Sequence, residues 1–104
     1  MKTINIAKDY SRYPGGRYRR DGKFNGEKFR QEILVPALSA NEKIEVVLDG
    51  ARSYGSSFLD EAFGGLVREE GYSKKELKRK LSIVSQDVVY LPYKLMAERY
   101  IDEA

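Results

Sequence analysis

The chain of 104 residues has room for one compact domain with a single hydrophobic core. Its 41% hydrophobic and 34% charged residues are typical of a soluble globular protein. Cysteine and histidine are both absent, which excludes disulfides, thiolate nucleophiles, zinc sites with Cys or His ligands, and the Ser-His-Asp triad. We therefore expect no catalytic residues, no metal site and no cofactor.

The net charge of +3 is distributed unevenly along the chain. Residues 11–24 and residues 73–81 each carry a local charge of +4, so the remainder of the chain is acidic. Two short basic patches are less than a nucleic-acid-binding protein usually shows, so nucleic acid is a disfavoured partner. No stretch approaches the roughly 18 apolar residues of a membrane helix, and Met1–Tyr10 lacks the apolar core of a secretory signal. We expect a cytoplasmic protein with no membrane partner.

The N-terminal quarter of the chain predicts a β-hairpin. Thr3–Ala7 alternates isoleucine with other residues, the period-2 pattern of a half-buried strand. The Pro14–Gly16 segment predicts a turn, and Arg17–Arg20 predicts a second short strand. Together these segments predict a hairpin or another ordered excursion over Asn5–Arg20.

A helix and a central strand are predicted next. Asn25 suits a helix N-cap, and apolar residues recur every fourth position from Phe29 to Ala37. Pro36 is expected to kink or end this helix. Lys43–Asp49 is nearly continuous in apolar character, which predicts a central strand covered on both faces.

The segment after this strand predicts a loop and a second helix. Gly50–Gly55 forms the loop, and Ser56 and Ser57 open the helix. The Ser57-x-x-Asp60 spacing matches a capping box, and Gly71 suits a left-handed helix end. The mid-helix pair Gly64-Gly65 costs about 1 kcal/mol per glycine relative to alanine, which predicts that close packing within the domain offsets this cost.

The last elements are a short basic helix, a strand and a terminal helix. Ser73 can cap the basic helix, whose lysines we expect to form a solvated face. Leu81–Ser85 predicts a third strand. Pro92–Ala104 predicts a helix packed through Leu95, Met96, Arg99 and Tyr100. Strands alternating with helices predict a single α/β domain over residues 1–104, with a central β-sheet covered by helices.

The strongest candidate site follows the central strand. In such folds, functional surfaces lie beyond the carboxyl ends of the strands, and a helix start offers free N–H groups to an anion. The candidate residues for partner binding or phosphorylation are Asp49, Tyr54, Gly55, Ser56, Ser57 and Phe58. In the alternative interpretation, the two serines only cap the helix.

A second candidate surface is the arginine-rich hairpin. Arginines interleaved with tyrosines suit single-stranded nucleic acid or an acidic protein surface. The basic patch consists of Arg12, Arg17, Arg19 and Arg20. In the alternative interpretation, the hairpin is solvated and its tyrosines cover the sheet edge.

The chain resembles a known family in four segments. These segments are Pro14–Tyr18, Gly26–Arg30, Pro36–Leu38 and Tyr54–Arg68. They are similar to a bacterial and phage family known as a STAS-like domain of unknown function. The order strand, Asp49, serine pair, helix also resembles the STAS domains of anti-sigma factor antagonists. The resemblance implies a STAS-like sandwich.

In those antagonists, a kinase phosphorylates a serine at the start of this helix and thereby switches partner binding. The resemblance places that serine at Ser56, although Gly55 stands where the antagonists have Asp, and Phe58 follows the serine pair where they have Gly. Asp60 and Glu61 are expected to repel an added phosphate.

We therefore predict a non-catalytic regulatory module that binds a protein partner, a regulator or kinase-like protein, through the loop and the helix that begins at Ser56. The oligomeric state stays open. The alternative is a small nucleic-acid-associated or phage-encoded inhibitor protein that uses the arginine-rich hairpin.

Overall fold

The computed structural model describes residues 1–104 and contains a parallel three-stranded sheet. Its strands are β1 (Lys2–Asn5), β2 (Ile44–Val47) and β3 (Leu81–Val84), in the spatial order β1-β2-β3. Both pairings are parallel, so each connection must cross over through helices. The predicted α/β class and the central position of β2 are confirmed.

The predicted N-terminal hairpin is wrong. The chain leaves β1 at Asn5 and enters the short helix α1 (Ile6–Asp9). The Asn5 side chain accepts a hydrogen bond from the Lys8 N–H at 3.1 Å, and the Asp9 carboxylate accepts one from the Asn5 N–H at 2.8 Å. This reciprocal capping ends the strand before it can turn back. The predicted second strand is a 3₁₀ turn, η1 (Arg19–Asp21).

Two long helices each contain a π-helical turn between α-helical ends. The first consists of α2 (Gly26–Phe29), η2 (Arg30–Leu34) and α3 (Val35–Ala40). The second consists of α4 (Ser56–Leu59), η3 (Asp60–Gly64) and α5 (Gly65–Arg68). The Asn25 cap is confirmed, because its side chain accepts a hydrogen bond from the Lys28 N–H at 2.8 Å. Pro36 does not end its helix.

The remaining helices follow the second π-containing helix. They are α6 (Lys74–Lys80), the 3₁₀ turn η4 (Val88–Tyr90) and α7 (Leu91–Glu103). The Ser73 cap is confirmed by a hydrogen bond from the Glu76 N–H to the Ser73 hydroxyl at 3.0 Å. Gly71 has a φ of 78°, as predicted for a left-handed helix end. None of the helices has the length and apolar character that spanning a bilayer requires.

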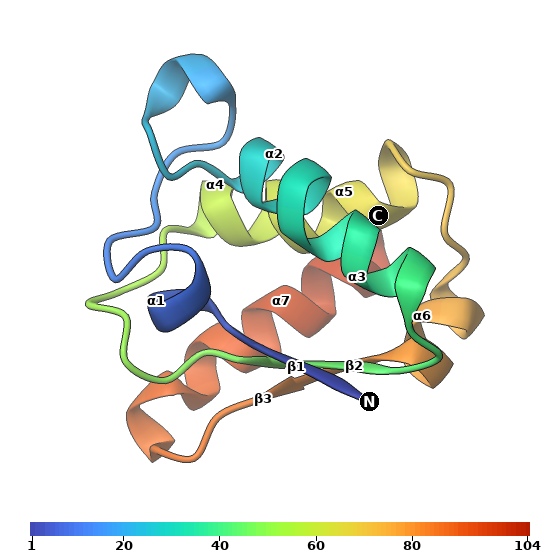
Figure 1. Ribbon diagram of the computed structural model, residues 1–104. Helices are drawn as coiled ribbons and strands as arrows, with labels where there is room; N and C mark the ends of the chain where they lie inside the picture. Colours follow the sequence, from blue (N-terminus) through green and yellow to red (C-terminus); the bar gives the residue numbers. More distant parts are fainter.

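The helices cover one face of the sheet. Figure 1 shows α2–α3, α4–α5 and α7 on the same side of the three strands. Strand residues facing the helices are buried, while Glu45 is half-buried and Ser82 is exposed on the other face. The prediction that β2 is covered on both faces is therefore wrong. The apolar run at β2 was misleading because Val47 lies on the open face and is only half-buried.

The packed face of α7 also differs from the prediction. Met96 and Tyr100 pack partly against the core, as expected, but the buried residues are Ala97 and Ile101, which were not predicted. Leu95, in contrast, is 55% exposed, and Arg99 is exposed. The helix packs mainly against η3.

Three glycines allow the helices to approach closely. A Cβ on Gly26 would clash with the Phe58 carbonyl oxygen of α4, and a Cβ on Gly65 would clash with the Arg30 guanidinium. At Gly64 it would lie 2.8 Å from the Asp60 carboxylate and 3.2 Å from the Tyr100 carbonyl oxygen of α7. The predicted role of Gly64 and Gly65 in close packing is confirmed.

We predict that Gly64→Val destabilises the fold by about 1–3 kcal/mol through overpacking, although valine has the higher helix propensity. Thermal melts of the variant should show a midpoint several degrees below that of the wild type. The control is Gly15→Ala, because a Cβ at Gly15 meets no atom within 4 Å. Equal midpoints for Gly64→Val and the wild type would contradict the close contact.

Candidate functional site

The loops that follow the three strands gather at one edge of the sheet, on the left of Figure 1. Two sets of hydrogen bonds connect them. The Arg52 N–H donates to the Arg12 carbonyl oxygen at 2.8 Å, which joins the second loop to the first. The Asp49 carboxylate accepts hydrogen bonds from the Gln86 and Asp87 N–H groups at 2.9 and 2.8 Å, which joins β2 to the loop after β3.

Three of the six predicted site residues are structural. Asp49 holds the loop after β3, as described above. Tyr54 is 4% exposed, and its hydroxyl donates to the Leu48 carbonyl oxygen at 2.7 Å. Burial raises the pKa of Tyr54 well above its usual value. Phe58 is fully buried and contacts the ring of Phe29, with ring centroids 5.8 Å apart. All three side chains support the loop, and the buried Tyr54 and Phe58 are not available to a partner.

The other three residues lie together on the surface. Gly55, Ser56 and Ser57 are all exposed at the start of α4. The helix N-cap is Gly55, and no side chain makes the capping hydrogen bond. The predicted capping box at Ser57 is therefore wrong, because the helix begins two residues earlier than that box requires. The alternative in which both serines act as caps does not fit this geometry.

The predicted basic patch is divided between ion pairs and exposed side chains. Arg17 is bonded to Asp60 at 2.8 Å, and Arg19 is bonded to Glu32 at 2.9 Å. The Arg20 guanidinium lies over the ring of Tyr18, 4.9 Å from its centroid. Arg12 is exposed, and so is the neighbouring Arg52. Within the predicted patch, the Arg17 guanidinium is therefore paired with a carboxylate of the domain and is not free to bind a ligand.

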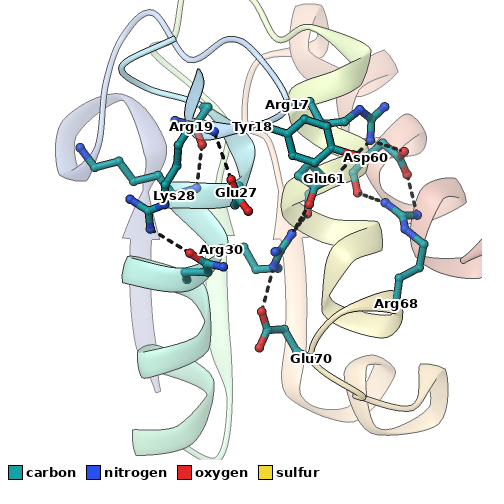
Figure 2. Close-up of polar contacts among 12 residues, drawn as sticks. Arg17, Tyr18, Arg19, Glu27, Lys28, Arg30, Asp60, Glu61, Arg68 and Glu70 are labelled. Atoms are coloured by element: carbon teal, nitrogen blue, oxygen red, sulfur yellow. Dashed lines mark hydrogen bonds and ion pairs between the residues drawn. The ribbon is translucent and has the colours of Figure 1, made fainter. Parts of the chain in front are cut away.

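A buried ion-pair network joins the two π-helical turns (Figure 2). Arg30 of η2 donates at 2.7 Å to the Glu61 carboxylate and at 2.7 Å to the Glu61 carbonyl oxygen of η3. The Arg30 Nε also donates to Glu70 at 3.0 Å. The side chains of Arg30 and Glu61 are only 2% and 6% exposed. π-Helical turns occur frequently at functional sites, and here two of them face each other through this pair.

The network continues to the surface through Asp60. Its carboxylate accepts hydrogen bonds from Arg17 at 2.8 Å and Arg68 at 3.0 Å. Arg17 also reaches Glu61 at 3.4 Å. Figure 2 shows Arg17 entering from the loop before α2 and Arg68 from α5, so Asp60 ties that loop to its own helix. Burial opposes ionisation of this carboxyl, but the two arginines outweigh it and lower the pKa of Asp60.

Sequence analysis missed this network. Two signals could have pointed to it: Arg30 occupies a position within the apolar stripe of its helix, and Gly65 leaves room for a large side chain from elsewhere. The prediction that Asp60 and Glu61 repel a phosphate at the start of α4 also needs correction. Asp60 and Glu61 are paired with arginines, so their charges are largely compensated.

We predict that the network makes stability depend on pH through Asp60. The pKa of Asp60 is lowered by folding, so its contribution is complete at neutral pH and is lost as the pH falls below the unfolded value of about 3.9. Urea unfolding at several pH values should show a shallower acid dependence for Asp60→Asn than for the wild type. The control is Asp102→Asn, since the exposed Asp102 carboxylate makes no ion pair. An acid dependence of Asp60→Asn as steep as that of the wild type would contradict this role.

The comparisons with known proteins place the chain in a family. No curated protein and no solved structure matches it. Residues 25–90 match the model of the family described as a STAS-like domain of unknown function (DUF4325). The matched range contains both π-helical turns, the serine pair of α4 and the last two strands. The chain therefore belongs to the family of STAS-like domains of unknown function.

Proposed function

We propose that the protein is a non-catalytic regulatory module that binds a protein partner through the loop Gly50–Gly55 and the first turn of α4. The observation that carries the proposal is the exposure of Gly55, Ser56 and Ser57 together, on the edge of the sheet where the loops meet. Functional surfaces of such sheets usually lie beyond the carboxyl ends of the strands. We call the surface around these three residues the serine edge.

The neighbouring side chains have the chemistry of a protein interface. Tyr13 is 66% exposed and lies in the same loop as Arg12, whose carbonyl oxygen bonds to the Arg52 N–H. Tyrosine and arginine are enriched in protein interfaces relative to other surfaces. The buried side chains of Tyr54 and Phe58 lie beneath the serine edge and fix the position of its backbone.

We also propose phosphorylation of Ser56 as the switch of this surface. A phosphate at Ser56 would lie at the helix N-terminus, which favours a negative charge by about 0.3–1 kcal/mol at an exposed site. The charges of Asp60 and Glu61 in the next turn are compensated by Arg17, Arg30 and Arg68. The added charge would act mainly on partner binding, because the partner surface that contacts a neutral serine would then face a phosphate dianion.

A nucleic-acid function has less support. Arg17 and Arg19, half of the predicted basic patch, are engaged in ion pairs within the domain. A phosphate backbone would have to displace carboxylates from both arginines before it could bind them.

The absence of histidine and cysteine is what supports a non-catalytic role over an enzymatic one.

We predict that Ser56→Asp leaves the fold intact and weakens partner binding. The measurement is affinity capture from the native host, with the captured proteins quantified by mass spectrometry for the wild type and for each variant. Thermal melts establish that each variant is folded. Ser56→Asp should lose the specific partner by at least about tenfold, as expected for a charge placed in a contact surface.

The matched control is Ser39→Asp, which adds the same charge at an exposed serine of α3. This variant should capture the partner at the wild-type level. Capture of the same proteins at equal levels by Ser56→Asp and the wild type would contradict binding through the serine edge.

A further inference from the structure

The strand β3 ends the sheet with unpaired main-chain groups. The Leu48 N–H donates to the Val84 carbonyl oxygen at 3.0 Å, so the main-chain groups of Val84 point toward β2. Because this direction alternates along a strand, the N–H and C=O of Ile83 point away from β2. The hydrogen bonds outside the helices and the sheet include none from Ile83. An open edge of this kind is a template for another strand.

A groove of about 510 Å³ runs along this edge. Its floor is β3, and its walls come from α6 and α7. The residues that line it include Lys78 of α6, Ile83 of β3, and Lys94, Glu98 and Asp102 of α7. At the opposite edge of the sheet, the Asn5 N–H of β1 is already bonded to Asp9. The β3 edge therefore combines free main-chain groups with space for side chains of an added strand.

Exposed apolar residues lie beyond one end of the groove. Leu91 and Leu95 are 41% and 55% exposed on α7. Leu91, Leu95, Glu98 and Asp102 follow one another at spacings of four, three and four residues, so they share one stripe of α7, of which Glu98 and Asp102 line the groove. Val88 and Val89, in the turn between β3 and α7, are 78% and 62% exposed. Exposed large apolar residues that gather in this way mark interaction surfaces.

The other end of the groove is basic. Of the five basic residues of helix α6, which leads into β3, Lys78 lines the groove, and the Lys74 ammonium donates at 2.7 Å to the carbonyl oxygen of the groove residue Asp102. The Asp102 carboxylate contributes one negative charge to the wall, while Lys94 and Glu98 neutralise each other at 3.0 Å, so Lys74 and Lys78 leave this end with one excess positive charge. An acidic segment would be attracted to this end, and an apolar segment would cover the leucines at the opposite end.

We propose that the β3 edge binds an extended segment of a partner protein as a fourth strand, with apolar residues beside Leu91 and Leu95 and acidic residues beside α6. Antiparallel addition is favoured because it is slightly more stable per residue. Main-chain hydrogen bonds would supply affinity, and the side-chain contacts would supply specificity, as in other cases of strand addition. The groove contains none of Gly55, Ser56 and Ser57, so variants of Ser56 and of Lys78 test the two proposals separately.

The test uses two fluorescein-labelled peptides. In the first, alternating threonine and valine residues are followed by a short run of glutamates, and in the second, lysines replace the glutamates. Fluorescence anisotropy should show the glutamate peptide binding at least about tenfold more tightly than the lysine peptide. Hydrogen exchange followed by NMR should show the Ile83 N–H exchanging at least about tenfold more slowly once the glutamate peptide is bound.

Variants separate the edge from general electrostatics. Lys78→Glu should weaken binding of the glutamate peptide by about tenfold, whereas Lys8→Glu, an equal charge change at an exposed lysine of α1, should leave it unchanged. Ser85→Pro removes the next outward N–H along the edge and should also weaken binding, with thermal melts confirming that the variant is folded. Ser56→Asp should bind the peptide like the wild type. Equal binding of both peptides, or binding without protection of the Ile83 N–H, would overturn the proposal.

Discussion

The fold depends on one buried ion pair, between Arg30 and Glu61. Both side chains are almost fully buried, and an unpaired charge in such a place costs several kcal/mol. Arg30 can be accommodated only because Gly65 leaves room for its guanidinium, and because Glu61 and Glu70 both accept its hydrogen bonds. The pair therefore specifies how the two π-containing helices lie against each other and against the sheet.

This contact also determines what the molecule presents to a partner. Arg17 extends the network from the buried pair to the loop before α2, and so ties that loop to the second helix through Asp60. The first turn of α4 is rigidly continuous with η3, so the position of Ser56 follows from the position of Glu61. The β3 edge is left open because β3 is the last strand of the sheet, with α6 and α7 beside it.

The sequence was sufficient for features that depend on local chemistry. The caps at Asn25 and Ser73, the left-handed Gly71 and the central strand β2 were all predicted from neighbouring residues. Apart from the close packing at Gly64 and Gly65, features that depend on distant contacts were not predicted.

No local pattern shows that Arg30 meets Glu61 or that only one face of the sheet is covered. The hairpin prediction failed because the Asn5 cap, which involves Asp9 and Lys8, ends the strand at Asn5 and begins a helix at Ile6. At the candidate site, the serines were identified correctly as exposed residues at a helix start, but their capping role was wrong.

The most direct test of the central claim is a double-mutant cycle at the buried pair, measured by urea unfolding. Glu61→Leu alone should cost about 3–5 kcal/mol, because it leaves the buried Arg30 without its main partner. Arg30→Met in the same chain removes the unpaired charge, so the double variant should be more stable than Glu61→Leu. Free energies of the two single variants that simply add in the double variant would contradict the account, since the two side chains would then act independently.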